Sequence, residues 1–188
     1  MQFAKDSFFL ALQQRLAGLN PGRTVTINGA TVPALLVLEN LPPSSGEPQP
    51  NTFYIEWGTG AVIDGHAGNA ALMSLGCVIS YYTLGTVQSM VDRGRVLGQL
   101  DNELLGICQP TSTEKMDYTH SPSVDLGTTV FWNQPTFELA TTSAVEDETL
   151  SYQARGVRRV MYEQAYQDGR AERRAQLTVF FFSEVTLL

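Results

Sequence analysis

A tight turn between two short segments of strand character constrains this 188-residue chain more than any other feature. The dipeptide Asn28-Gly29 directly follows the segment Thr24–Ile27, and a return strand then runs through Val32 to Glu39. Both turn positions tolerate a positive φ, so the dipeptide favours a two-residue hairpin, which joins antiparallel strands. Pro33 lacks a backbone N–H and therefore restricts the first half of the return strand to a sheet edge or a bulge.

A second turn signal, Asp168-Gly169, lies near the C-terminus between Val157–Tyr166 and Ala175–Val185. The second of these segments is rich in β-branched and aromatic residues, which favour strands. We therefore expect residues 155–182 to form a long two-stranded hairpin arm. A helix over residues 163–175 is the competing interpretation, because its Ala, Glu, Gln and Arg content favours helices.

Two further segments carry apolar residues at helical spacing. The first covers residues 6–19, where Asp6 can cap the start and Pro21-Gly22 stops the helix. The second and longer one covers residues 86–108, which Thr86 can cap. Each predicted helix has one apolar face, so each is expected to pack on a sheet.

Two glycines, Gly94 and Gly98, lie one turn apart on the same face of the longer predicted helix. A glycine in a helix interior costs about 1 kcal/mol relative to alanine. The pair therefore indicates either the close approach of a sheet or another helix, or two tolerated weak points.

These elements predict an α+β fold with a mostly antiparallel sheet, on which the N-terminal helix and the long central helix pack, plus the C-terminal hairpin. The length is that of a single domain, residues 1–188. The proline-rich segment 41–50 and the polar segment 111–127 are expected to be long loops. Further strands are expected at Thr52–Trp57, Leu75–Leu84, Thr128–Trp132 and Thr136–Thr141.

Charge is divided unevenly along the chain. Residues 1–150 carry six basic and fifteen acidic side chains, a balance of −9, whereas residues 151–188 carry six basic and four acidic ones, a balance of +2. The acidic excess argues against general nucleic-acid binding, which needs a basic field. It remains compatible with a surface past which nucleic acid slides without adhering.

The six basic residues of the C-terminal segment are all arginines, and they are the strongest local charge feature. They are compatible with a grip on phosphate or RNA, with a solvated edge that prevents strand aggregation, and with a docking surface for an acidic neighbour such as another copy of the chain. The candidate subunit-interface residues are Arg155, Arg158, Arg159, Arg170, Arg173 and Arg174.

No set of residues predicts catalysis, so we expect no enzymatic activity, no cofactor and no metal. His66 and His120 have no partner at metal-ligand spacing. Four glycines follow a predicted strand, but no phosphate-binding motif is present and the segment is interpreted as a flexible connector. These glycines are Gly58, Gly60, Gly65 and Gly68.

The remaining reactive groups also receive structural interpretations. Cys77 and Cys108 each lie in an apolar stretch and are expected to be buried thiols. Asp101 and Glu103 fall on different faces of the longer predicted helix, which makes them surface charges rather than an acid–base pair.

The order of elements, the missing catalytic set and the acidic bulk resemble the tail-terminator proteins of long-tailed bacteriophages. In that family an amphipathic N-terminal helix precedes a strand that ends near a proline-bearing loop, and a sheet, a packed helix and a last strand complete the subunit. The matching segments here are DSFFLALQQRLAGL, TVPALLVLENLPP, TVQSMVDRGRVLGQLDNELLGIC and AQLTVFFFSEV. Relative to small family members, segments 58–74, 111–127 and 142–174 are insertions.

The resemblance implies a structural virion protein of the tail or neck, present in the host cytoplasm during assembly. Its subunits would form a ring, usually a homohexamer, that caps the tail tube and joins it to the head. The implied partners are other copies of the chain, the tail tube protein and neck or connector proteins. DNA would pass through an acidic lumen without sticking to it.

Other interpretations remain open. They are another neck or head-completion protein, a cytosolic α+β ligand-binding protein or enzyme with a pocket between helix and sheet, and a dimeric RNA-binding module. The apolar run Phe8–Leu12 is too short for a signal peptide and Val179–Phe182 is far too short for a membrane span, so we expect a soluble intracellular protein without a membrane partner.

Overall fold

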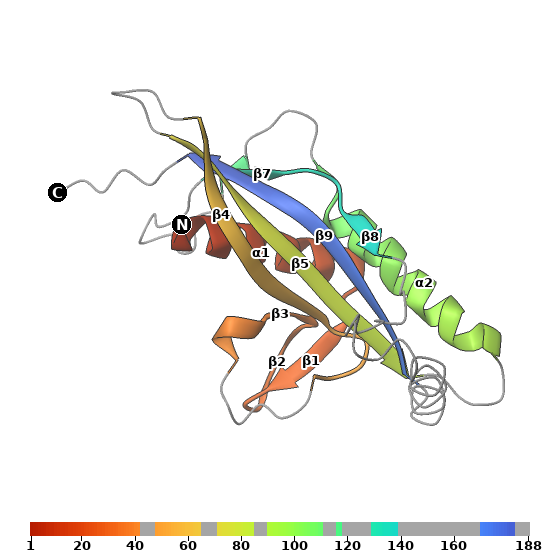
Figure 1. Cartoon of the computed structure of the whole chain (residues 1–188). Helices are drawn as coiled ribbons and strands as arrows, with labels where there is room; N and C mark the ends of the chain where they lie inside the picture. Colours follow the sequence, from red (N-terminus) through yellow and green to blue (C-terminus); the bar gives the residue numbers. More distant parts are fainter. Residues whose placement is uncertain are drawn as a thin grey trace, which may run out of the picture.

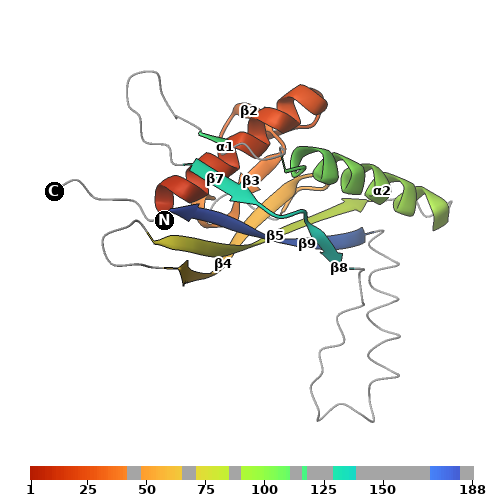
Figure 2. The same ribbon diagram turned by 90° about the horizontal axis from the view of Figure 1, so that it is seen from above.

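The computed structural model describes residues 1–41, 48–64, 71–84, 90–110, 116–117, 129–138 and 170–182. They form two layers, a seven-stranded sheet and a pair of helices that pack on one face of it (Figures 1 and 2). The elements are α1 (Gln2–Leu19), β1 (Thr24–Ile27), β2 (Ala30–Pro33), β3 (Leu35–Val37), the 3-10 helix η1 (Leu38–Asn40), β4 (Phe53–Asp64), β5 (Leu72–Leu84), α2 (Met90–Ile107), β6 (Met116–Asp117), β7 (Thr129–Trp132), β8 (Thr136–Glu138) and β9 (Arg170–Phe182).

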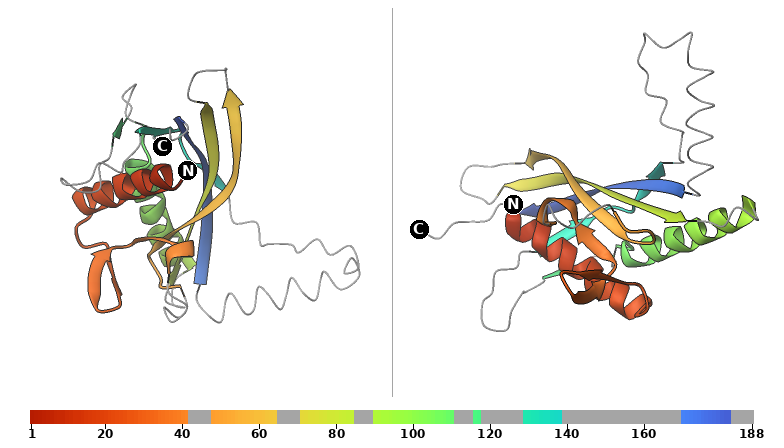
Figure 3. Two further views of the ribbon diagram at one scale, coloured as in Figure 1. Left: turned by 90° about the vertical axis from the view of Figure 1, so that its left-hand side faces the viewer. Right: turned by 90° about the horizontal axis from the view of Figure 1, so that it is seen from below.

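The large sheet has the order β3-β4-β5-β9-β7-β6, and β8 pairs with β9 beside β7. Only β3 and β4 are parallel, and every other pair in it is antiparallel. Figure 3 (left) shows α1 and α2 on the same side of this sheet. The predicted α+β class is therefore confirmed, with a mostly antiparallel sheet and both predicted helices packed on it.

The N-terminal helix begins earlier than the sequence predicted. It starts at Gln2, and Met1 rather than Asp6 occupies the position before it. Ala4 is fully buried in line with Phe8, so the apolar stripe extends one turn further toward the N-terminus and holds that turn against the sheet. The helix ends at Leu19, before Pro21-Gly22, as predicted.

The first turn signal is confirmed. Asn28 and Gly29 have φ values of 50° and 81°, and they join β1 to β2 in a separate two-stranded sheet. The predicted return strand is divided, because β2 ends at Pro33 and the chain then enters the large sheet as β3. The expected strand end at Glu39 is instead part of η1.

The strands around the glycine-rich segment are longer than predicted. Gly58 and Gly60 lie within β4, so this part of the chain is strand rather than a connector, and β5 already begins at Leu72. The pairing with β5 shifts register between Trp57 and Gly60, which marks a bulge. A Cβ atom at Gly58 would lie 3.5 Å from the carbonyl oxygen of Gly76, which is an ordinary van der Waals contact. Gly65 and Gly68 lie outside the described residues.

The predicted hairpin arm is described only from Arg170 onward. Residues 170–182 form β9, which pairs over its whole length with β5 and on its other side with β7 and β8. This strand therefore lies inside the sheet, and the helical alternative is wrong from residue 170. An alternating apolar pattern suits an interior strand, and β5 offers a partner of equal length. Residues 155–169, with the second turn signal, lie outside the described residues.

The structure describes parts of the two predicted loops, 41–50 and 111–127, and most of the longer predicted helix. Within segment 111–127, Met116–Asp117 forms β6, which is a correction to the expectation of a continuous loop. Within segment 41–50, Leu41 and residues 48–50 lie outside helices and strands, as expected. The longer helix runs from Met90 to Ile107, and Thr86, its predicted cap, lies outside the described residues. Pro135 lies between β7 and β8, in the gap between the two strands predicted at Thr128–Trp132 and Thr136–Thr141.

The main core lies between the helices and the sheet. Phe8 of α1 makes edge-to-face contacts with two tryptophans, Trp57 at 5.6 Å and Trp132 at 5.1 Å between ring centroids. Such aromatic pairs stabilise a core by about 0.5–1.5 kcal/mol beyond their buried area. A smaller cluster of buried residues joins the β1–β2 hairpin to β3 and β4 through Val25, Ala34, Leu36 and Tyr54.

Candidate interaction surface

The central strands β5 and β9 present two very different faces. Their alternate residues from Leu75 to Tyr81 and from Ala175 to Phe181 point toward the helices and are buried. The residues between them form the outer face, where Glu172, Arg174 and Gln176 are exposed. One strand pair thus supplies both the core and an uncovered surface, as the two-residue period of a strand allows.

One end of the outer face is covered by the chain itself. Tyr54 and Tyr82 alternate with the inner residues, and both are buried. The hydroxyl of Tyr54 accepts a hydrogen bond from the backbone N–H of Gln49 at 2.6 Å, and the hydroxyl of Tyr82 donates to the carbonyl oxygen of Pro48. The end of the proline-rich segment is therefore anchored over these two tyrosines.

The opposite end of the molecule is apolar and exposed, and we call it the apolar end. Ten large apolar side chains are exposed in the described part of the chain, and six of them gather here. They come from the start of α1, the end of β4, β7 and the end of β9, which lie close together in Figures 1 and 2. The six are Met1, Phe3, Val62, Ile63, Phe131 and Phe182.

Strand register brings two members of the apolar end, Phe131 and Phe182, to the outer face of the sheet. Phe131 pairs with Phe180, and their rings stack at 5.2 Å between centroids. Phe182 follows on the same face two residues later, where it pairs with Leu72. The side chain of Met1 packs against β4, because its sulfur lies 3.2 Å from where a Cβ atom at Gly60 would be. Exposed apolar clusters of this kind mark interaction sites.

The sequence missed the apolar end because its members are far apart along the chain. One signal was present. Three consecutive phenylalanines, Phe180–Phe182, must place apolar rings on both faces of a strand, so at least one ring falls on the face away from the core. Val62 and Ile63 carry the same signal in β4.

The six predicted interface arginines have different outcomes. Arg155, Arg158 and Arg159 lie outside the described residues, and Arg170 is described only as the first residue of β9. Arg173 and Arg174 are neighbours in a strand and therefore point to opposite faces. Arg174 is exposed on the outer face, where β8 places Glu138 opposite it. The structure thus does not bring these two arginines into one cluster.

Arg173 is held inside the subunit by helix α2. Its Nε lies 3.2 Å from Oδ1 of Asp101, at an angle that does not make a hydrogen bond. The hydroxyl of Tyr81 donates to the same Oδ1 at 2.5 Å. Burial, and then the hydrogen bond to the Asp101 carboxylate, raise the pKa of Tyr81 well above its usual value. Asp101 is therefore an internal link between helix and sheet rather than the solvated surface charge that was predicted.

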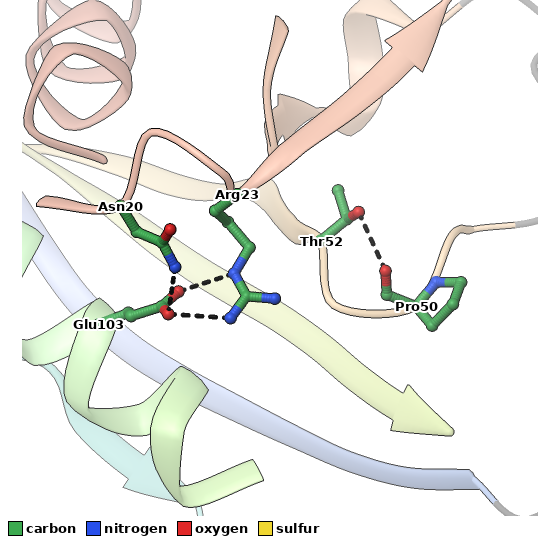
Figure 4. A network of polar contacts seen from close by, with 5 residues as sticks. All are labelled: Asn20, Arg23, Pro50, Thr52 and Glu103. Carbon is green, nitrogen blue, oxygen red and sulfur yellow. Dashed lines mark hydrogen bonds and ion pairs between the residues drawn. The ribbon is translucent and has the colours of Figure 1, made fainter. Parts of the chain in front are cut away.

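Glu103 is also paired, in the network of Figure 4. Both carboxylate oxygens accept from Arg23, each at 2.8 Å, and the Asn20 amide donates to one of them at 2.8 Å. The same view shows the Thr52 hydroxyl donating to the carbonyl oxygen of Pro50 at 3.4 Å. A bidentate arginine–carboxylate pair fixes geometry as well as charge, so this network orients the α1–β1 connection against α2.

Backbone carbonyl groups at the C-terminal end of α2 accept hydrogen bonds from two side chains. Nη1 of Arg15 donates to the carbonyl oxygens of Ile107 and Gln109, at 2.8 and 2.7 Å. The indole N–H of Trp132 donates to the carbonyl oxygen of Cys108 at 2.8 Å. One cation and one indole N–H thus satisfy three carbonyls at the end of this helix.

Both cysteines are buried free thiols, as predicted. Burial raises the pKa of Cys108 to about 12, and burial together with the nearby Cys108 raises that of Cys77 well above its usual value. The two histidines lie outside the described residues. Among the described residues no group of histidine, cysteine, aspartate and glutamate side chains could hold a metal ion.

Helices long and apolar enough to cross a membrane are absent from the described part of the chain. Comparison with protein-family models gives no match for this sequence, and comparison with curated proteins gives none either.

Proposed function

We propose that this chain is a structural protein of a phage virion, the tail terminator, whose copies form a ring that caps the tail tube and connects it to the head. The apolar end is the observation that carries this proposal. A protein that ends a growing tube must cover apolar and main-chain groups that the last tube layer leaves exposed. A compact subunit with six exposed apolar side chains at one end offers a surface for that task.

The charge of the chain supports the same proposal. Residues 1–150 have a balance of −9, and on the outer face of the sheet Glu56, Glu138 and Glu172 are exposed. Acidic walls repel the phosphates of a duplex, so DNA passes through such a ring without being retained. The ring itself must close, because a head-to-tail contact that does not close grows into a filament.

Deletion of the gene from the phage that encodes the protein tests the proposal. Electron microscopy of the lysate is expected to show tails of uncontrolled length, or finished tails that never join heads. Correct tails without heads would place the protein at another layer of the neck. Normal virions of normal infectivity would contradict a neck function of any kind.

Complementation with variants assigns the effect to the apolar end. The double variant Phe131→Ser/Phe182→Ser changes two exposed rings, and we expect it to fold and to form rings but to leave tail length uncontrolled. Leu84→Ser is the matched control, since Leu84 is 54% exposed at the other end of β5. Equal rescue by both variants would exclude the apolar end as the docking surface.

A further inference from the structure

The large sheet has several edges that no strand covers in the described part of the chain, and two of them could pair with each other between copies. The first is the edge of β4 beyond Ile55, because β3 pairs only with Phe53–Ile55 and the chain then turns into η1. The second is the outer edge of β8, which pairs with β9 on its other side. Each edge presents backbone N–H and C=O groups that can bind another strand.

Between the charged residues Glu56 and Asp64, the edge of β4 lacks the side chains that usually block strand pairing. Residues 56–64 contain no lysine, arginine or proline, and residues 58–64 are all exposed. Val62 is 62% exposed, although its register partner Met73 packs against the core. A second bulge lies between Val62 and Asp64, so the regular stretch available for pairing is Gly60–Val62.

The edge strand β8, Thr136–Glu138, is as long as the regular stretch Gly60–Val62 of β4. The direction of β8 and the faces to which its side chains point are also compatible with pairing to β4. β8 runs antiparallel to β9, and β9 is antiparallel to β5, which is antiparallel to β4. A β8 strand that continues the sheet of another copy in the same orientation therefore lies antiparallel to β4. Phe137 packs against the core on the inner side, and Thr136 and Glu138 are exposed.

We propose that the edge of β4 in one copy pairs with the edge of β8 in the next copy, so that the sheets continue head to tail around the ring. Val62 then lies opposite Phe137 on the inner face, and Ala61 lies opposite Glu138 on the outer face. An aromatic residue opposite a β-branched one is a favourable cross-strand pair. The inference deepens the proposed function and rests on the ring that this function requires.

Charge and register disfavour two of the registers in which two copies of β4 could pair with each other. An antiparallel pair centred on Gly60 places Glu56 opposite Asp64 twice, and like charges directly opposite one another are destabilising. A pair centred on Val62 must run through the bulge between Val62 and Asp64. The proposed contact between β4 and β8 is heterologous, which is the kind that builds rings of more than two copies.

Cysteine cross-linking tests the pairing. In the double variant Ala61→Cys/Glu138→Cys both new thiols are exposed, and opposite positions of antiparallel strands lie within the span of a disulfide. We expect oxidation to give a ladder of covalent multimers on non-reducing gels that ends at the ring size seen by native mass spectrometry. The natural thiols Cys77 and Cys108 are buried, so they do not contribute to this ladder in the folded protein.

Three control variants locate the contact. Ala61→Cys/Thr136→Cys shifts the pair by two residues and is expected to cross-link at least tenfold more slowly. Glu138→Cys alone is expected to give no multimers. Covalent dimers from Ala61→Cys alone would show that β4 pairs with itself, which would overturn the inference.

The outcomes separate this inference from the proposed function. Rings of the unaltered protein together with no cross-link in the matched double variant would overturn the β4–β8 pairing and leave the terminator function standing. A full ladder together with normal tails in the gene deletion would keep the pairing and reject the function. A strictly monomeric protein without cross-links would reject the pairing and the ring.

Discussion

The two faces of the sheet are made by the same strands, yet they differ in almost every physical property. Phe181 is fully buried against the helices, whereas Phe182, the next residue of β9, is 39% exposed. The inner face is apolar and continuous, and the outer face carries glutamates, an arginine and a stacked aromatic pair. The inner face therefore carries most of the buried core, whereas much of the described outer face stays exposed to solvent.

The largest expected difference between the two faces concerns these neighbouring phenylalanines. Phe181→Ala leaves a cavity in the core and should lower the free energy of unfolding by about 3–5 kcal/mol. Phe182→Ala should lower it by about 1 kcal/mol or less, because much of its ring already contacts water. Urea denaturation of both variants measures the two values. Equal losses of unfolding free energy would mean that the outer face contributes as much to stability as the inner face.

Alkaline pH should weaken the inner face specifically. The folded pKa of Cys108 is about 12, above its usual value of 9.0, so the thiol ionises in the unfolded chain first. This contribution is fully present below about pH 9 and is lost as the pH rises toward 12. Between pH 9 and 11 the free energy of unfolding should fall by about 2–3 kcal/mol from this group alone.

Cys108→Ala is the variant that isolates the contribution of this thiol. Its free energy of unfolding should decline less between pH 9 and 11 than that of the unaltered protein, while Cys77 and Tyr81 still contribute in the same direction. Urea denaturation at a series of pH values measures both slopes. Identical slopes would contradict the assigned burial of Cys108.

Substitution of the two adjacent arginines, Arg173 on the inner face and Arg174 on the outer face, tests how the faces differ in charge. Arg173→Ser removes the cation beside Asp101 and should cost about 1–2 kcal/mol, because both groups are largely shielded from water. Arg174→Ser on the exposed face should change the free energy of unfolding by about 0.5 kcal/mol or less. Thermal or urea unfolding at moderate salt measures both, and a larger loss for Arg174 would reverse the assignment of faces.

A small stabilising effect is expected on helix α2. A Cβ atom at Gly94 or Gly98 would meet nothing within 4 Å, so Gly94→Ala and Gly98→Ala should each stabilise the monomer by up to about 1 kcal/mol. The close approach that these glycines indicated is thus absent from the described part of the chain. Loss of rings in either variant, without loss of monomer stability, would place a neighbouring copy against this helix.

Local sequence signals were sufficient for the elements whose causes are local. Asn28-Gly29 specified its turn through the φ values that both residues tolerate, and Pro21-Gly22 ended α1. The helical period of the two helices also indicated their apolar faces. These features depend on neighbours within one or two turns of the chain, which a sequence displays directly.

Non-local pairing could not be predicted in the same way. The sequence assigned the last strand to a nearby partner across Asp168-Gly169, whereas β9 pairs with β5, far away in the chain. The bulge between Trp57 and Gly60 arises in the pairing of β4 with β5, whose partner residues lie far along the chain. The members of the apolar end likewise converge only after the sheet has formed, so composition alone did not reveal them.

The pairing of β5 with β9 also has a consequence for biosynthesis. Leu84 pairs with Arg170 and Leu72 with Phe182, so the middle of the sheet closes a very long loop and contributes a high contact order. During translation β4 and β5 leave the ribosome well before β9 exists, and until then their apolar residues lack a partner. Slow folding and transient exposure of strand edges favour aggregation, so the nascent chain is expected to need a chaperone until residue 182 has emerged.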